Sequence, residues 1–178
     1  MFSDIRETLL SEQELGEIVA RLGAQISADY RDKNLLLVSV LKGSIVFMAD
    51  LMRAVTVPCR IDFMAVSSYG ASAVSSGAVK IVKDLDINLA GYDVLIVEDI
   101  LDSGRTLNYI LELMETRSPK SVKICTLLDK PERRQVELKV DYVGAEIPDE
   151  FVVGYGLDYD ECYRNLPFVG VLKPEIYS

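Results

Sequence analysis

The chain has 178 residues, of which 49% are apolar and 26% are charged. This length and composition fit one globular domain with a buried core. Acidic residues outnumber basic residues by 28 to 19, giving a net charge of −9, whereas nucleic-acid-binding proteins usually carry a basic surface. The sequence has no histidine, which excludes Ser-His-Asp and Cys-His catalysis and histidine-ligated zinc.

The sequence also predicts where the protein resides. The first ten residues carry acids and lack a basic n-region, so we expect no signal peptide. The strongly apolar runs, such as residues 35–41, are too short to span a bilayer. The three cysteines form no C-x-x-C pair and fit a reducing compartment better than a disulfide framework. We therefore expect a cytoplasmic protein without membrane or nucleic-acid partners.

The first third of the chain predicts a helix, a buried strand and a second helix. Ser11 and Glu14 form an S-x-x-E capping box, which marks a helix start. Apolar residues then follow with helical spacing: Leu15, Ile18, Val19, Leu22 and Ile26. Residues 35–41 are mainly apolar, as in a strand covered on both faces, and an apolar helix over residues 45–54 is expected next.

The middle of the chain predicts further strands around an irregular loop. Ile61, Phe63 and Ala65 alternate with Arg60, Asp62 and Met64, which is typical of a strand with one wetter face. From 67 to 77 the residues are mostly small and polar, which indicates a mobile loop of the kind that often acts as a lid. Residues 79–82 and 94–97 resume as strands, the second of them fully buried.

The remaining pattern predicts the fold class. Helical spacing follows at Leu107, Ile110, Leu111 and Met114, and residues 122–128 form another apolar strand. Apolar strands that alternate with helices predict an α/β fold with a central, mostly parallel sheet flanked by helices. We expect one domain over residues 1–178, with a core at about 30–130. A small cap (hood) is expected from about 1–10 and 131–178, where short strand-like pieces are broken by Gly and Pro.

The run VLIVEDILDSGRTL, residues 94–107, carries the chemistry. A buried strand ends in Glu98 and Asp99, Asp102 follows, and a loop of small and hydroxyl residues opens a helix. In open parallel sheets, ligands bind beyond the carboxyl ends of strands. Backbone amides at a helix N-terminus form a phosphate cradle, and the preceding acids suit Mg²⁺ or sugar hydroxyls. An Asp-Ser-Gly turn alone is more often a simple helix cap, but the complete run of residues 94–107 favours a phosphate site.

This run resembles the phosphoribosyl-pyrophosphate (PRPP) motif of the type I phosphoribosyltransferases. Further segments are similar to the hypoxanthine–guanine branch in order and spacing: LKGS at 41–44, SSYG at 67–70, KDLD at 83–86, LLDK at 127–130 and FVVGYGLDYDECYR at 151–164. The resemblance covers nearly the whole chain. It implies the type I phosphoribosyltransferase fold and transfer of 5-phosphoribosyl from PRPP to hypoxanthine, guanine or both, giving IMP or GMP and pyrophosphate.

The resemblance implies roles on the ribose-phosphate side. The loop matched to the 5′-phosphate consists of Ser103, Gly104, Arg105 and Thr106. Glu98 and Asp99 match the pair that faces the ribose hydroxyls and Mg²⁺, and Asp158 matches a further Mg²⁺ contact. The residues matched to pyrophosphate are Lys42, Gly43 and Arg164. The family has a non-proline cis peptide in this loop, which would place it at Leu41–Lys42.

On the base side, Asp102 matches the acid near N7 of the purine, the proposed proton acceptor, a role for which no histidine is available. Lys130 matches the lysine that donates to the 6-oxo group. Because an ammonium favours an oxo acceptor over an amino group, we expect adenine to be rejected by ~10⁴ or more. The remaining matches are Phe151, which stacks on the purine, Val152 and Asp158 beside it, and the lid dipeptide Ser68 and Tyr69.

Other functions are compatible with parts of this pattern. A regulatory protein that senses PRPP or a nucleotide could keep the same fold, because fold alone does not fix function. A related transferase could use xanthine, adenine or uracil, although Lys130 and residues 151–159 favour 6-oxopurines. A scaffold protein would not need phosphate, metal and base motifs in register. The resemblance also implies a homo-oligomer, either a dimer or a tetramer.

Overall fold

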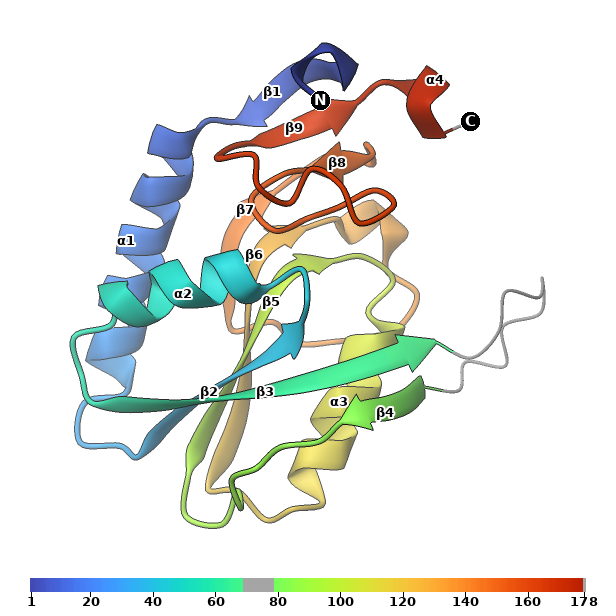
Figure 1. Cartoon of the computed structure of the whole chain (residues 1–178). Helices are drawn as coiled ribbons and strands as arrows, with labels where there is room; N and C mark the ends of the chain where they lie inside the picture. The colour runs from blue at the N-terminus through green and yellow to red at the C-terminus, as the bar shows by residue number, and fades with distance from the viewer. Residues whose placement is uncertain (69–78, 178) are drawn as a thin grey trace.

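A six-stranded sheet forms the centre of the computed structural model, which describes residues 1–68 and 79–177 (Figure 1). Its strand order is β4-β3-β2-β5-β6-β7. The strands are β2 (Leu35–Leu41), β3 (Cys59–Ser68), β4 (Val79–Lys83), β5 (Asp93–Leu101), β6 (Ser121–Asp129) and β7 (Tyr142–Glu146). Each neighbouring pair is parallel except β3 and β4. The predicted mostly parallel sheet is therefore confirmed.

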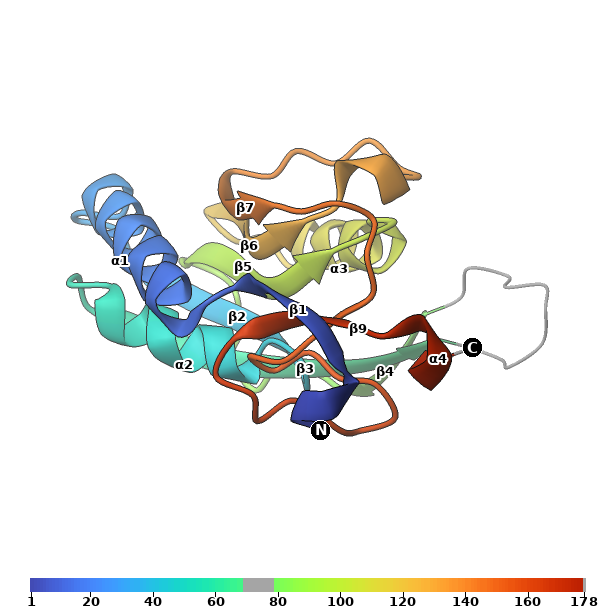
Figure 2. The ribbon, with the colours of Figure 1, turned by 90° about the horizontal axis from the view of Figure 1, so that it is seen from above.

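Helices cover both faces of this sheet (Figure 2). The helices α1 (Glu12–Asp29) and α2 (Ile45–Ala54) pack on one face, and α3 (Arg105–Glu115) packs on the other. The predicted capping box starts α1: the Ser11 hydroxyl accepts from the Glu14 N–H at 3.3 Å, and the Glu14 carboxylate accepts from the Ser11 N–H at 2.8 Å. Burying one face of each helix provides most of its stability.

The two-sided cover explains the apolar run of β2. Leu35 and Leu37 belong to the core cluster beneath α1 and α2, whereas Leu36 and Val38 belong to the cluster beneath α3. Successive side chains of a strand point to opposite faces, so a strand with two covered faces needs apolar residues at nearly every position. Residues 94–97 of β5 are equally buried, as expected.

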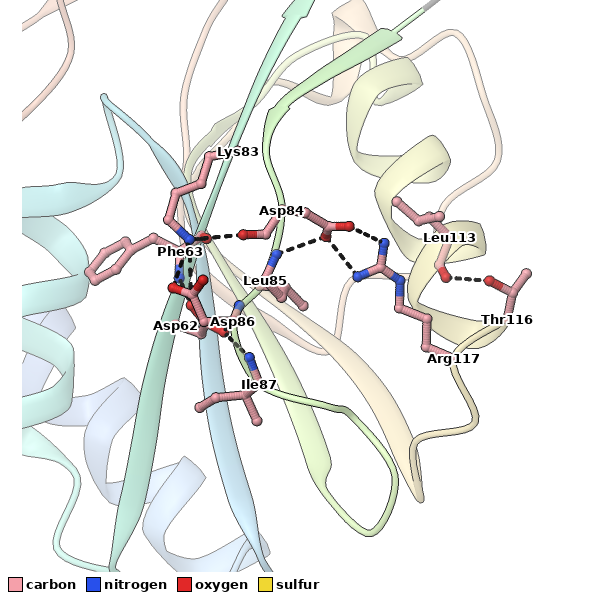
Figure 3. Close-up of polar contacts among 10 residues, drawn as sticks. All are labelled: Asp62, Phe63, Lys83, Asp84, Leu85, Asp86, Ile87, Leu113, Thr116 and Arg117. Carbon is pink, nitrogen blue, oxygen red and sulfur yellow. Dashed lines mark hydrogen bonds and ion pairs between the residues drawn. The ribbon is translucent and has the colours of Figure 1, made fainter.

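The residue types of β3 do not match the burial of its two faces. Asp62 and Met64 are buried, whereas Ile61 is 39% exposed. The buried Asp62 carboxylate has hydrogen-bond partners, because it accepts hydrogen bonds from the backbone N–H groups of Asp86 and Ile87, each at 2.9 Å (Figure 3). A buried carboxylate with such partners avoids the cost of an unpaired charge. Of the predicted loop at 67–77, Ser67 and Ser68 extend β3, and the rest lies outside the described residues.

A second, smaller sheet lies above the carboxyl ends of β5 and β6 (Figure 1). Its order is β1-β9-β8, with β1 at Ile5–Leu10, β8 at Val152–Val153 and β9 at Val169–Leu172. The described residues also contain three short helices: η1 (Phe2–Asp4), η2 (Pro131–Arg133) and α4 (Pro174–Tyr177). We call the small sheet and its loops the hood. One strand within the segment expected to form the hood, β7, instead pairs with β6 in the large sheet.

None of the helices in the described part of the chain is long and apolar enough to cross a membrane.

Candidate active site

The loop between β5 and α3 lies at the carboxyl edge of the large sheet. Glu98 and Asp99 lie in the C-terminal half of β5, and Gly104 is the N-cap of α3, with a φ of 81°. A left-handed backbone of this kind favours glycine, because a Cβ would be strained there. The residues expected to bind a phosphate therefore lie at the N-terminus of α3. The backbone N–H groups there have no partner within the helix and favour an anion.

A cavity of about 260 Å³ opens over this loop. It is lined by most of the residues expected on the ribose-phosphate side, namely Gly43, Glu98, Asp99, Ser103, Gly104 and Thr106, and also by Asp102. The sheet brings Gly43 here because β2 and β5 are parallel neighbours, so both strands end at the same edge. The cavity combines backbone donors, two hydroxyl side chains and three carboxylates.

The segment after β6 braces the phosphate loop from the side. Gln135 donates its backbone N–H to the Ser103 carbonyl at 3.0 Å, and Arg134 donates Nε–H to the Asp102 carbonyl at 3.3 Å. Arg134 also forms an ion pair with Asp129 at the end of β6. The loop backbone is thus held in place before any ligand binds, which lowers the ordering cost of binding.

The loop between β2 and α2 approaches the end of β5 very closely. The Leu41–Lys42 peptide bond is cis, at the position implied by the family resemblance. An added Cβ on Gly43 would collide with Oδ2 of Asp99, and one on Gly156 would collide with the Gly43 carbonyl. Three chain segments therefore meet at Gly43, and only residues without a side chain allow this contact.

Replacing Gly43 with Ala should damage the site more than the fold. The group that must move is the Asp99 carboxylate, and a misplacement of about 1 Å in an active site can cost about 100-fold in rate. We expect kcat/KM for PRPP to fall by this order, with Tm nearly unchanged. Steady-state kinetics and thermal denaturation measure both quantities.

Gly16→Ala is the matched control. Gly16 lies inside α1, and a Cβ there would meet no atom within 4 Å. Alanine should stabilise the helix by about 0.5–1 kcal/mol and leave activity intact. Equal activity losses in the two variants, or an active Gly43→Ala enzyme, would contradict the proposed role of the close contact.

The paired carboxylates of β5 are half-buried. Burial raises the pKa of Asp99 to about 6, although the Ile100 N–H donates to Asp99 at 2.8 Å and opposes the shift. Burial and the neighbouring Asp99 charge raise the pKa of Glu98 well above its usual range. A divalent cation or ribose hydroxyls would favour the charged forms. The donors are all oxygen atoms, which fits Mg²⁺.

The expected metal residues do not make a complete cation site by themselves. Within residues 1–68 and 79–177, no group of three or more Cys, Asp or Glu side chains is arranged to hold a metal ion. Mg²⁺ usually keeps several waters and shares the phosphates of its substrate. A cation held by Glu98, Asp99 or Asp158 would therefore need further ligands from water or from a bound phosphate.

A second cavity of about 420 Å³ adjoins the first beneath the hood. It is lined by the residues expected on the base side, namely Asp102, Lys130, Phe151, Val152 and Asp158, together with others from the hood and η2. Ile100 and Asp102 line both cavities. Asp102 therefore stands where a group bound in the first cavity would meet a group bound in the second.

Lys130 lines the second cavity and is nearly buried. The residue is 8% exposed, and Nζ donates to the Glu150 carbonyl at 2.6 Å. An ammonium has three donors, so further donors remain for a ligand acceptor. Asp102 is fixed by Arg133, whose Nε donates to Oδ1 at 3.0 Å, and Arg133 also lies 3.6 Å from Asp149.

Some expected residues lie outside these two cavities. Lys42 forms an exposed ion pair with Glu161 at 2.8 Å, and Arg105 is exposed on α3. Arg164 lines a third, larger cavity of about 570 Å³ between α1, α2 and the hood, although it pairs with Asp158 at 2.9 Å. Tyr69 lies outside the described residues, and of Ser68 the structure describes the backbone at the end of β3.

The structure adds residues that the sequence pattern did not indicate. Arg133, Asp149 and Tyr177 line the second cavity, and Ile100 lies between the two cavities. The motif DKPERR contains Arg133, but two adjacent arginines on a loop are usually solvated. No local signal links Tyr177 to the site, because its position depends on pairing between distant strands.

Comparison with known proteins identifies the class. The phosphoribosyl transferase domain family matches residues 6–160, so the chain belongs to this family. Among curated proteins, it is 55% identical to the hypoxanthine-guanine phosphoribosyltransferase of Bacillus subtilis, covering all of this chain and 99% of that protein. It is 56% identical to the bifunctional protein TilS/HprT of Listeria monocytogenes, of which it spans only 28%.

Solved structures agree with the fold. A crystal structure of a hypoxanthine phosphoribosyltransferase from Staphylococcus aureus superposes with a TM-score of 0.97 at 52% identity, covering 100% of this chain and 97% of that one. The predicted type I phosphoribosyltransferase fold is therefore confirmed.

Proposed function

We propose that this chain is a purine salvage enzyme that transfers the 5-phosphoribosyl group of PRPP to hypoxanthine, guanine or both. In the reaction, the bond between ribose C1 and the pyrophosphate oxygen breaks, and a bond between C1 and a purine nitrogen forms. The products are IMP or GMP and pyrophosphate, and the base loses one proton. The relatives that match this chain over their full length carry names for this activity.

One observation carries the proposal: the two adjoining cavities share Asp102. A phosphoribosyl donor fits the first cavity, with its phosphate at the N-terminus of α3 and its ribose near Glu98 and Asp99. A flat base fits the second, between Ile100 and Phe151. The position of this carboxylate at the junction supports its assignment as the general base that takes the proton of the purine.

The other residues position the reactants. Ser103, Gly104 and Thr106 hold the 5′-phosphate, and the loop at Gly43 receives the pyrophosphate with help from Lys42 and Arg164. Lys130 donates to the 6-oxo group, and Phe151 stacks on the ring. Holding two reactants together can replace much of the entropic cost of a bimolecular step, so positioning provides a large part of the rate.

Mg²⁺ is the proposed cofactor. When bound, it would neutralise the charge on the pyrophosphate oxygens as the C1–O bond breaks. Glu98, Asp99 and Asp158 are the residues that would hold it, directly or through water. The raised pKa of Asp99, which results from burial, agrees with a site that is completed by a cation.

A base panel tests the proposal. The purified chain, PRPP and Mg²⁺ are incubated with hypoxanthine, guanine, xanthine, adenine or uracil, and nucleotide formation is followed. We expect IMP and GMP but no AMP or UMP, and we expect EDTA to abolish the reaction. PRPP binding without turnover on any base would instead favour the alternative, a PRPP- or nucleotide-sensing regulator, which no present finding supports.

We further propose a cytoplasmic homo-oligomer, a dimer or a tetramer. Two large apolar side chains are exposed on the edge strand β4 and its neighbour β3: Val82 at 65% and Ile61 at 39%. Exposed apolar side chains of this size fit an interface between copies. Light scattering during size-exclusion chromatography should give a multiple of the 19.8 kDa chain mass.

A further inference from the structure

The ring of Phe151 is held between two tyrosines of the hood. Tyr177 in α4 stacks on it, with ring centroids 4.6 Å apart and an interplanar angle of 20°. Tyr159 meets it edge-on, at 5.6 Å and 86°. Phe151 is 37% exposed and lies just before the two-residue strand β8. The orientation of its ring is therefore only weakly restricted by the neighbouring backbone. The two tyrosines supply that restriction.

The pairing of β8 with β9 brings Tyr177 to this place. Val152 pairs with Val171, and the Leu172 N–H donates to the Phe151 carbonyl at 2.8 Å. Just beyond β9, the Lys173 N–H donates to the Asp4 carbonyl at 2.9 Å, which directs the chain into α4. The C-terminal helix is thus attached to the backbone of Phe151 and to the N-terminal segment.

Tyr177 forms a wall of the second cavity but does not fill it. Both Tyr177 and Phe151 line this cavity, and a volume of about 420 Å³ remains with both rings in place. Ligand pockets for small molecules begin at about 300 Å³, so a purine can enter without displacing Tyr177. Tyr177 does not line the cavity assigned to PRPP.

We propose that Tyr177 is a positioning residue of the base site, which acts by fixing the plane of the Phe151 ring. This inference rests on the proposed function, in which the purine stacks on Phe151. A ring with a preset orientation loses little freedom when the base binds, so the base binds more tightly. Because PRPP occupies the other cavity, Tyr177 affects the affinity for the base and leaves that for PRPP unchanged.

The test compares three variants with the unsubstituted enzyme. Tyr177→Leu keeps the apolar bulk but loses the stacked ring, and we expect KM for hypoxanthine and guanine to rise about threefold to tenfold. KM for PRPP should stay within about twofold, since the loss concerns base binding alone. Tyr177→Phe keeps the ring and should restore the original KM for both bases.

Ile176→Ala is the matched control, because Ile176 lies in the same helix and packs against the hood cluster without lining the cavity. It should lower Tm without changing KM for either base. An active Tyr177→Leu enzyme with unchanged base KM would overturn the inference alone. Equal rises in base KM in Tyr177→Leu and Ile176→Ala would also overturn it, since they would indicate general loosening of the hood. An inactive unsubstituted chain would overturn the proposed function itself.

Discussion

Asp102→Asn should reduce kcat by about 100- to 10,000-fold, the range that general acid–base catalysis usually contributes. The substitution keeps the size and one acceptor oxygen of the side chain, so Arg133 can still donate to it. Asparagine cannot accept the proton that the base releases. The fold should persist, because the Asp102 side chain is 45% exposed and its ion pair with Arg133 lies at the surface. Single-turnover kinetics measures the loss of the chemical step, and calorimetric titration with PRPP measures whether the variant still binds PRPP.

Arg133→Gln separates the proton-acceptor role from the ion pair. This variant loses the charge that contacts Asp102 but keeps the carboxylate itself. We expect its kcat to fall far less than that of Asp102→Asn. Turnover that is unchanged in Asp102→Asn would refute the proton-acceptor role. Losses of similar size in both variants would show that Asp102 acts through its contact with Arg133 instead.

The central part of the fold could be predicted because its signals are local. A strand with both faces covered is apolar at nearly every position, as in β2 and in residues 94–97 of β5. The capping box of α1 involves residues only three positions apart. The phosphate loop is contiguous with β5 and α3, so placing those two elements also places Asp102 and Gly104.

The incorrect predictions concern long-range contacts. Which face of β3 is buried depends on N–H groups of Asp86 and Ile87, more than twenty residues further along the chain. β7 lies in a segment that resembles the hood in composition, yet it completes the large sheet through pairing with β6. In both cases a distant backbone partner determines the result, and residue type alone does not contain that information.

In the active site too, local contacts could be predicted from the sequence and long-range contacts could not. Residues of the phosphate loop meet in one cavity, and the Arg164 guanidinium lies beside Gly43, since a Cβ added there would be 3.7 Å from Nη1. By contrast, no sequence pattern predicted that Tyr177 lines the base cavity. Tyr177 lies in the short helix α4 after β9, so its position depends on the pairing of β8 with β9 and not on a local pattern. Motifs on regular elements are therefore the more reliable guide to geometry in this chain.

Lys130→Ala should weaken base binding and selectivity while sparing PRPP. A hydrogen bond from a charged donor contributes about 1.5–3 kcal/mol, so kcat/KM for hypoxanthine and guanine should fall about 10- to 100-fold. Adenine carries an amino group where these bases carry an oxo group, and it gains nothing from the ammonium. The preference for 6-oxopurines over adenine should therefore shrink by a similar factor. Competition assays with paired bases measure this ratio directly.

Lys139→Ala is the matched control for charge. Its side chain is 88% exposed and lies 3.8 Å from Asp141, outside both cavities, so all kinetic constants should stay unchanged. In Lys130→Ala, the Glu150 carbonyl also loses its donor, and part of the loss could come from movement of that backbone. Such movement would reduce activity on every base by the same factor, whereas loss of the 6-oxo contact reduces activity on 6-oxopurines alone. Equal losses of activity on every base would therefore show that Lys130 does not recognise the 6-oxo group. Its role would then be to hold the hood in place.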